Sequence, residues 1–471
     1  MRLEVPSSTC RFIEEPSLLF GGERQHVCPK QGTTRFGPRS VDMPNRHPEI
    51  VHIGLIGSGE TIEPALSWME SCAKGVAGTK AEPDFPGFMK DRGFFSELRF
   101  EQTVAETITQ RDLSDLRAIS RRRDRFDFCV SLLDDKLRLL AQRDRSPDYV
   151  VLALPSEVVK DCGTVDYVDR DLGAVHRDLR RALKAVAMKH RLPTQILLEA
   201  TTKPWTEASK TDHPARCAWN FFTGLYYKSG GIPWMPHGLP SSTCYVGISF
   251  HRLPGSKQSA YFTGLAQAFD EHGNGLVLRG QDFEWDVRKH GSSPHLPEQA
   301  AEDLINTVLK RYRDEVKQLP RRVVIHKTSN YWPAERSGIQ RALRAIEQHD
   351  LVCVQPSDEL RVLREARYPV LRGSHVSIDR THLLYTVGYI AALQAFPHGH
   401  VPTPLRLTEH VGDTPIGVVL SEILVLTKMN WNSAHFGGLL PITLKFAKLV
   451  GEIMKEVPRT LEPLPQFKYY M

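Results

Sequence analysis

Short apolar runs alternate with amphipathic helical patterns through residues 50–240. Each run has the length of one buried strand, and each pattern places its apolar residues on one face of a helix. The predicted order is strand 50–56, helix 62–72, strand 149–154, helix 177–190 and strand 195–198. Alternation of this kind is typical of a parallel sheet covered by helices. We therefore predict a parallel α/β domain over residues 49–240.

In residues 241–471 the strands come first, and most of the helices follow. The predicted strands are 245–250, 275–278 and 323–326, and the predicted helices are 298–318, 339–347, 416–424 and 443–456. Residues 1–48 are rich in proline, glycine and other turn-forming residues, which favours an extended arm over a domain. The predicted organisation is thus an arm (1–48), an α/β domain (49–240) and a second domain (241–471).

The composition is that of a soluble globular protein. Hydrophobic residues make up 41% and charged residues 25% of the 471 positions, enough for two or three domains with their own cores. A net charge of +6 permits a nucleic-acid partner without requiring one. The eight cysteines never form Cys-x-x-Cys, which argues against a zinc ribbon or a disulfide framework. With no signal peptide and no membrane-spanning run, we expect a cytoplasmic protein without a membrane partner.

Four polar residues suggest an anion-binding site. Arg180 and Lys184 are four positions apart, so they share one face of the predicted helix 177–190. Gln195 opens the next strand, and Lys228 ends a helical pattern before Ser-Gly-Gly-Ile-Pro-Trp. Cations and an amide donor that converge on one spot suit a terminal phosphate, because fixed charge offsets the anion and the donors orient it. Considered without Gln195 and Lys228, Arg180 and Lys184 could equally lie on a solvated face of the helix.

These residues resemble a known pattern. Arg-x-x-x-Lys, Pro-Thr-Gln and Lys-Ser-Gly-Gly-Ile-Pro-Trp, in this order, resemble the MID domain of Argonaute proteins. The resemblance implies a Rossmann-like fold for 49–240. It also implies that Arg180, Lys184, Gln195 and Lys228 hold the 5′ phosphate of a guide strand. Glu-Pro near residue 15 and Phe-Gly-Pro at 36–38 resemble the linker that precedes this domain.

The second domain resembles PIWI, whose fold is that of RNase H. The matching segments are 244–250, 322–329, 424–433 and 440–448. Cleavage by this fold needs carboxylates that hold two Mg²⁺ ions. At the corresponding positions this chain has Ser249, Thr328 and Lys448, and the remaining glutamate position falls near Asp282 or Glu284. A single carboxylate cannot hold a metal pair, so we predict that no nuclease centre exists.

A chain with these two domains and without room before residue 50 for further domains resembles the short prokaryotic Argonautes. That likeness implies binding of a guide RNA with a 5′ phosphate and recognition of a complementary single-stranded DNA target. It further implies activation of a partner with an APAZ domain and a TIR or sirtuin-like NADase. The system would deplete NAD⁺ in prokaryotic defence against viruses and plasmids. The residues themselves leave open whether the guide is RNA or DNA.

Further residues enter as candidates. Lys445 and Lys448 would contact the nucleic-acid backbone, although an exposed helix lysine explains Lys448 equally well. The family also uses a C-terminal carboxylate to help hold Mg²⁺ at the 5′ phosphate, which makes Met471 a candidate metal ligand.

Alternative interpretations stay open. The protein could bind targets without an effector, or it could be an active nuclease with a displaced metal site at Asp282, Glu284 and Asp286. The Gly-Ser-Gly at 57–59 invites a dinucleotide-binding interpretation, but it lacks Gly-x-Gly-x-x-Gly and the later acidic residue, so a tight strand-to-helix turn is favoured. The His-Gly-His at 398–400 lacks further ligands and is treated as a loop.

Overall fold

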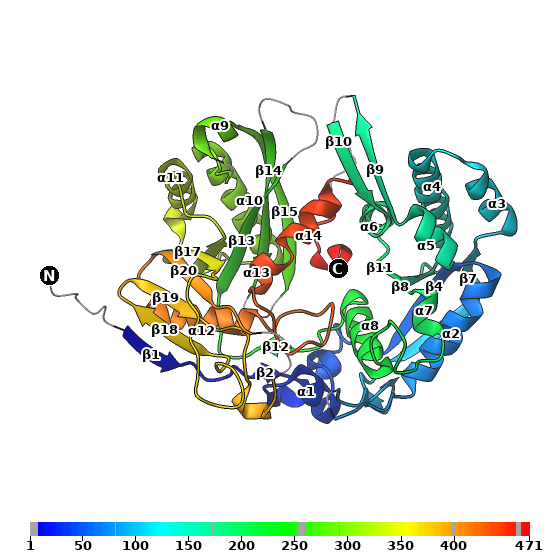
Figure 1. Ribbon diagram of the computed structural model, residues 1–471, viewed down its shortest axis with the longest axis horizontal. Coiled ribbons are helices and arrows are strands. Elements are labelled where there is room, and N and C mark those ends of the chain that lie inside the picture. Colours follow the sequence, from blue (N-terminus) through cyan, green and yellow to red (C-terminus); the bar gives the residue numbers. More distant parts are fainter. Residues whose placement is uncertain are drawn as a thin grey trace.

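Two sheets organise the chain, as the computed structural model shows (Figure 1). The structure describes residues 8–80, 82–170, 173–252, 260–270, 272, 274–291, 293–396, 401–457 and 463–471. A mixed α/β fold results, with a four-stranded sheet in the first part and a nine-stranded sheet in the second.

The four-stranded sheet is parallel, in the order β11-β8-β4-β7. Its strands are β4 (Ile50–Gly57), β7 (Glu97–Thr107), β8 (Tyr149–Ala153) and β11 (Thr194–Ile196). In β8, Val150 and Leu152 pack with α4 (Arg122–Ala141) and α6 (Leu179–Lys189), while Val151 packs on the other face with α2 (Gly59–Ala73). Both faces of the central strands β4 and β8 are buried, which is why these two strands are largely apolar, whereas the edge strand β7 carries several charged residues.

Shorter elements complete this part. They are α3 (Gln110–Ala118), α5 (Ser156–Cys162), the hairpin β9 (Thr164–Asp169) and β10 (Gly173–Asp178), α7 (Glu199–Thr202) and α8 (Pro214–Lys228). The small strands are β5 (Phe88–Met89) and β6 (Arg92–Gly93).

The nine-stranded sheet has the order β1-β18-β19-β20-β17-β16-β13-β14-β15. β13 pairs in parallel with β16, as does β16 with β17, and the other pairs are antiparallel. The strands are β1 (Ser8–Phe12), β13 (Thr243–Arg252), β14 (Ala260–Phe269), β15 (Gly275–Trp285), β16 (Arg322–Lys327), β17 (Gln348–Pro356), β18 (Ser374–Ile378), β19 (Thr381–Leu384) and β20 (Leu405–Val411).

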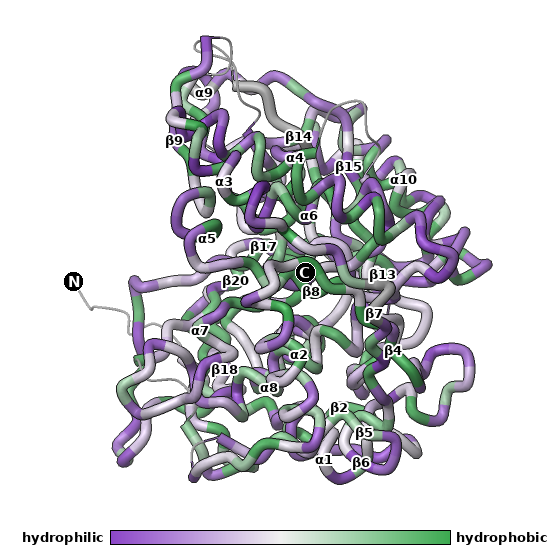
Figure 2. The backbone as a smooth tube through the Cα atoms, turned by 90° about the vertical axis from the view of Figure 1, so that its right-hand side faces the viewer, coloured by the Kyte–Doolittle hydropathy of each residue, from purple (hydrophilic) through white to green (hydrophobic). Residues whose placement is uncertain are grey.

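Helices cover both faces of the larger sheet. One face packs against α10 (Glu298–Val316) and α11 (Pro333–Ala342). The other packs against α12 (Ile416–Leu426), α13 (Ile442–Lys445) and α14 (Ala447–Met454). The short α9 (Val287–His290) follows β15, and the chain ends in a 3₁₀ turn, η5 (Phe467–Tyr470). In Figure 2 the tube is largely hydrophobic around β8 and the C-terminus and largely hydrophilic at the outer loops.

The N-terminal segment joins both parts. β1 adds to the edge of the large sheet, β2 (Leu18–Leu19) pairs with β3 (Gln25–His26) and β12 (Met235–Pro236), and α1 (Pro29–Phe36) follows. The buried carboxylate of Glu15 accepts from Arg372 Nε at 2.8 Å and from Lys428 Nζ at 2.9 Å. The segment is thereby anchored to the second domain.

Three predicted helices differ from the structure. The helix predicted for 339–347 is wrong at its C-terminal end, because α11 ends at Ala342 and β17 starts at Gln348. The helix predicted for 443–456 is interrupted at Phe446. Arg177 belongs to β10, since the side chain of Asp178 caps α6 by accepting from Arg181 N at 3.1 Å. Among the helices described, none is long and apolar enough to span a bilayer.

Candidate anion-binding site

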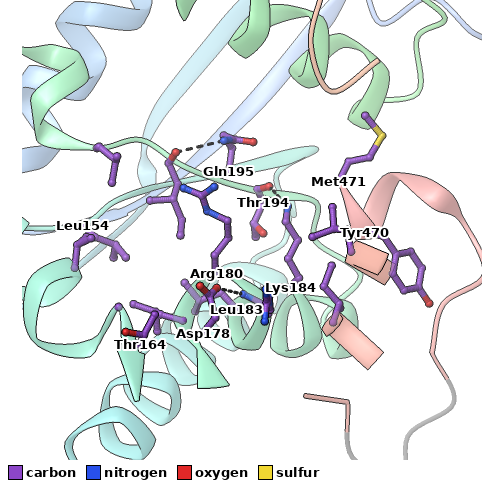
Figure 3. A pocket seen from close by; sticks show the side chains of 18 of the residues that line it. Leu154, Thr164, Asp178, Arg180, Leu183, Lys184, Thr194, Gln195, Tyr470 and Met471 are labelled. Atoms are coloured by element: carbon purple, nitrogen blue, oxygen red, sulfur yellow. Dashed lines mark hydrogen bonds between the residues drawn. The ribbon is translucent and has the colours of Figure 1, made fainter. Parts of the chain in front are cut away.

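Helix α6 presents two cations to a cavity. Its residues Ala182, Leu183 and Val186 are buried against the sheet, so the apolar stripe fixes the rotation of the helix. Arg180 and Lys184 then lie one turn apart toward β11 (Figure 3). The prediction that they share a face is confirmed.

The cavity has a volume of about 570 Å³. Arg180, Lys184, Gln195 and Met471 all line it, together with Thr194 and side chains from α14 (Figure 3). Met471 is 3% exposed and Tyr470 is 1% exposed, so η5 forms a buried wall. The last residue of the printed sequence thus lies at the same cavity as the predicted cations.

The two lysine amines converge on one carbonyl group. Lys184 Nζ donates to Thr194 O at 2.8 Å, and Lys228 Nζ donates to the same oxygen at 3.3 Å. Lys228 Nζ also donates to Gln195 Oε1 at 3.0 Å. Lys228 is fully buried at the end of α8 and stands behind the cavity wall formed by Gln195. All four predicted residues are therefore brought together, with Lys228 in a supporting position.

Burial controls the charge of these amines. Burial, together with the nearby positive charge of Arg180 and against the opposing effect of the hydrogen bond with Lys228, lowers the pKa of Lys184 to about 7. Burial also lowers the pKa of Lys228 well below the usual lysine range, with Lys184 as the next cause. Desolvation disfavours the charged form, and a bound anion would favour it again. An anion in the cavity would therefore be bound with uptake of protons.

Ion pairs hold the second domain against this cavity. Arg181 Nη1 contacts Glu452 Oε2 at 2.8 Å, and Arg177 Nη2 contacts Glu456 Oε2 at 2.8 Å. Both glutamates belong to α14 or follow it directly, and Arg181 lines the cavity together with Arg180. The cavity therefore forms at a junction of the two domains.

Sequence reasoning missed the Thr194 carbonyl, Asn432, Lys160 and Thr164, which also contribute to the site. The carbonyl is a backbone atom and leaves no trace in residue type. Asn432 comes from the far end of the chain, and its place depends on how the domains pack.

Part of the chain is similar in sequence to a known protein. The protein argonaute of Thermus thermophilus is 28% identical over 298 residues, which cover 59% of this chain and 38% of that protein. No protein-family model matches the chain. The chain is a homologue of Argonaute proteins.

Argonaute structures share the fold. Clostridium butyricum Argonaute bound to a guide DNA and a 19-mer target DNA superposes with a TM-score of 0.65 at 16% identity, over 96% of this chain and 54% of that one. Aquifex aeolicus Argonaute gives a TM-score of 0.58 at 15% identity, over 98% of this chain and 55% of that one. The chain thus spans about half the length of these structures, and its fold matches the MID and PIWI domains of Argonautes.

In the PIWI-like domain, the neighbouring strands β13 and β16 pair in parallel as far as Gly247 and His326. The predicted nuclease positions Ser249 and Thr328 each lie two residues beyond this last pair. The Ser249 hydroxyl is buried, with no hydrogen-bond partner among the described residues. Thr328 is exposed, and its carbonyl accepts from Gln355 Nε2 at 2.5 Å.

Helices α13 and α14 lie directly on β13 at this point. A Cβ atom at Gly247 would overlap the backbone of Thr443, and one at Gly451 would overlap the ring of His251. Lys445 is half-buried with Nζ 5.9 Å from the centroid of the Phe446 ring. Lys448 belongs to α14, and its side chain lies outside the described residues.

The acidic residues at the end of β15 and just after it differ in their surroundings. Asp282 accepts from Arg279 Nη2 at 3.2 Å, and Asp286 accepts from the backbone of Arg288 at 3.0 Å, while Glu284 is exposed. Within the described ranges, no group of three or more His, Cys, Asp or Glu residues is placed to hold a metal ion.

The glycine-rich turn at Gly57 is structural. A Cβ there would meet Ala153 O at 2.6 Å, and Ser58 with Thr61 forms a capping box at the start of α2. The predicted strand-to-helix turn is confirmed. The His-Gly-His at 398–400 lies outside the described residues.

Proposed function

We propose that the cavity between α6, β11 and η5 binds the 5′ phosphate of a guide strand, and that the guide then selects a complementary strand. The observation that supports this most is the convergence of Arg180, Lys184 and Gln195 on one cavity with Lys228 behind them. Burial lowers the pKa of the Lys184 and Lys228 amines, and a bound anion would favour their protonated form. Guanidinium and amide donors orient a phosphate, and the lysines supply charge.

Structures of similar proteins contain guide, target or other nucleic acids. The Clostridium butyricum Argonaute structure contains a guide DNA and a target DNA, and an Aquifex aeolicus Argonaute structure carries an externally bound siRNA. For this chain we propose a guide RNA and a complementary single-stranded DNA target. Base pairing would supply the sequence specificity, and the protein would grip backbone phosphates.

A Mg²⁺ ion is compatible with the cavity. This ion keeps several waters and is usually held by one or two carboxylates together with phosphate oxygens. A terminal carboxylate at Met471 is the protein ligand that we assign to it, beside a bound phosphate, because the amide oxygen of Gln195 accepts from Lys228 Nζ at 3.0 Å. The ion would neutralise phosphate charge, while Arg180 and Lys184 would orient the same group.

We propose further that the chain itself does not cleave the target. At two positions where the resemblance to PIWI implies metal ligands, this chain has the hydroxyls of Ser249 and Thr328, and the Asp282 carboxylate is paired with Arg279. Hydroxyls without adjacent carboxylates are poor ligands for Mg²⁺. The output would come from a partner, an APAZ-containing TIR or sirtuin-like protein that depletes NAD⁺ in defence against invading DNA.

The proposal is tested by the nucleic acid that accompanies the protein. The chain is co-expressed with the neighbouring reading frame, purified, and the bound strands are labelled at their 5′ ends before and after phosphatase treatment. We expect short strands that accept label only after phosphatase, and their loss in Arg180→Ala/Lys184→Ala. An intact, soluble complex without short strands would refute guide loading.

The same preparation distinguishes the alternatives. A co-purifying partner that consumes NAD⁺ when target DNA is added supports the effector model, and a loaded protein without any partner supports a stand-alone binding role. Cleavage of a matched target in Mg²⁺ or Mn²⁺ by the purified, loaded protein would support a displaced nuclease centre.

A further inference from the structure

An open trough lies at the carboxyl ends of the neighbouring parallel strands β16 and β17, and its volume is about 430 Å³. The loop that follows β16 contributes Ser329, Asn330 and Trp332, and the end of β17 contributes Gln355. Ligands commonly bind at this edge of an α/β sheet, because the loops that follow parallel strands meet there. Figure 1 places α11, β17 and β20 in its left half, away from α6 and the C-terminus at the anion-binding site. The trough is therefore a separate cavity.

The lining of the trough is polar and contains no acidic residue. It consists of Ser293, His295, Ser329, Asn330, Trp332, Gln355, Arg406 and Thr408. Within this set Arg406 is the only arginine or lysine, and no aspartate or glutamate opposes it. The charge of the lining therefore favours an anionic group over a cationic one.

Two carboxylates lie close to the trough without lining it. Arg406 Nη1 contacts Glu359 Oε2 at 2.5 Å, and the two side chains are 36% and 76% exposed. An ion pair this exposed is weak because water screens it, so a phosphate can replace Glu359 at the guanidinium and the carboxylate then returns to water. Glu409 follows Thr408, and its carboxylate accepts from Tyr331 N at 2.8 Å. Both carboxylates therefore have partners, and neither needs to repel an anion at Arg406.

Trp332 supplies a flat apolar surface in this polar setting. Its ring stacks on His295 with centroids 4.7 Å apart and an interplanar angle of 17°, and it meets Trp285 at 4.9 Å and 58°. Trp332 is half-buried, whereas His295 and Trp285 are both buried, so Trp332 forms the outer layer of this cluster of rings. An aromatic side chain that remains accessible at the surface suits a second flat ring stacked on it.

A buried ion pair fixes the ring beneath Trp332. His295 Nδ1 lies 3.4 Å from Glu335 Oε2, and the same carboxylate oxygen contacts Lys327 Nζ at 2.5 Å. Glu335 and Lys327 are both fully buried, so their charges compensate each other below the trough. The stacking surface is thus held in place before any ligand binds, which reduces the entropy cost of binding.

Amide groups beside the ring can reach the edge of a base or a sugar hydroxyl. Asn330 Oδ1 accepts from Thr408 Oγ1 at 3.1 Å, which leaves the Nδ2 donors of Asn330 for a ligand. Gln355 Nε2 donates to Thr328 O at 2.5 Å, which leaves Gln355 Oε1 as an acceptor. An aromatic face with a donor, an acceptor and a cation around it is the set of groups that binds single-stranded nucleic acid.

We propose that the trough binds an unpaired nucleotide of a DNA strand, with its base on Trp332 and a neighbouring phosphate against Arg406. The base must be unpaired, because a base inside a duplex is already stacked between its neighbours. Ser329 directly follows Thr328, so the trough adjoins one of the predicted nuclease positions. We take the strand to be the target, and this assignment rests on the proposed function, whereas binding of the nucleotide requires no guide.

Photocrosslinking locates the bound nucleotide. The purified full chain is mixed with a short single-stranded DNA that carries 5-iodouracil, which on irradiation forms a covalent bond to an aromatic side chain stacked on it. The strand ends in a 5′ hydroxyl, so it has no terminal phosphate for the anion-binding site. We expect mass spectrometry to find the crosslink at Trp332. Crosslinks that form only in other segments of the chain would overturn the proposal.

Affinity measurements test the two groups separately, by fluorescence anisotropy with the same strand lacking iodine. Trp332→Leu keeps an apolar side chain but removes the aromatic face, so we expect binding about tenfold weaker, whereas Trp332→Phe should stay within about threefold of the unaltered chain. Arg406→Ala should weaken binding and reduce the slope of log affinity against log salt by about one. The matched control is Arg380→Ala, which removes an exposed arginine at the turn between β18 and β19 and should change neither quantity.

Equal affinities for Trp332→Leu and Trp332→Phe, or equal salt slopes for Arg406→Ala and Arg380→Ala, would overturn the site. If circular dichroism shows that Trp332→Leu is unfolded, the crosslink and the two arginine variants still decide. Free deoxythymidine 5′-monophosphate that displaces the strand at an equal concentration of nucleotide would assign the trough to free nucleotides and overturn the strand. A 5′ phosphate that adds nothing to the affinity would refute the proposed function, while the crosslink still decides the trough.

Discussion

We predict that phosphate binding depends on pH through the charge of Lys184. In the free protein its pKa is lowered to about 7 by burial and by Arg180. A bound phosphate places negative charge beside the amine and raises that pKa again. Lys184 is then protonated in the complex but only partly protonated in the free protein. The stabilisation is therefore fully present below pH 7 and is lost as the pH rises above 7.

The magnitude follows from the pKa. At pH 7 about half of the free protein carries a protonated Lys184, and at pH 9 about one molecule in a hundred does. Binding must supply the missing proton, which costs about 1.4 kcal/mol per pH unit. We therefore expect the preference for a 5′ phosphate to fall by about fiftyfold between pH 7 and pH 9. The phosphate is already a dianion over this range, because its second pKa is about 6.

The assay is a fluorescence-anisotropy titration with two strands that differ only in a 5′ phosphate or a 5′ hydroxyl. The ratio of their dissociation constants removes pH effects on the rest of the interface. Lys184→Arg is the matched variant, because a guanidinium stays charged to pH 9. Between pH 7 and pH 9 we expect the ratio to change about fiftyfold more in the unaltered chain than in Lys184→Arg. Equal slopes would refute the assigned role of Lys184.

Three further predictions concern single side chains. Arg180→Ala should reduce the preference for a 5′ phosphate by about 2 kcal/mol, or roughly thirtyfold, in the same titration at pH 7, and an unchanged ratio would place the phosphate elsewhere. Gly247→Ala should lower the melting temperature by several degrees, because its Cβ would overlap the backbone of α13. The control Gly59→Ala should leave the melting temperature unchanged, because no atom lies within 4 Å of the added Cβ. Equal melting temperatures for the two variants would contradict the close packing at Gly247. Arg322→Met removes the guanidinium that contacts the buried carboxylate of Glu422 at 2.5 Å, and it should lower the free energy of unfolding in urea by about 3–5 kcal/mol. A loss below about 1 kcal/mol would count against a buried ion pair.

The periodicity of the sequence was sufficient to place the first two cations. Four positions on an amphipathic helix specify one face, and the buried stripe through Leu183 specifies which way that face points. The order of strands and helices similarly predicted the parallel sheet that carries Gln195. Both inferences rely on local patterns, which a sequence records directly.

Other parts of the site depend on contacts between distant segments. The shared carbonyl of Thr194 is a backbone atom, and the depth of Lys228 arises from the packing of α8 against the sheet. The place of Met471 depends on how the last turn docks between α6 and α14. The break at Phe446 likewise follows from the close packing of α13 and α14 on β13, which no propensity of the helix itself encodes.

The central claim is that the cavity beside Arg180, Lys184 and Gln195 holds a 5′ phosphate. An experimental structure of the full chain with a short 5′-phosphorylated strand tests it most directly. We expect the terminal phosphate within hydrogen-bonding distance of all three side chains, with Met471 at the same cavity. A strand bound with its 5′ phosphate in solvent or against another surface, with the cavity empty, would contradict the account.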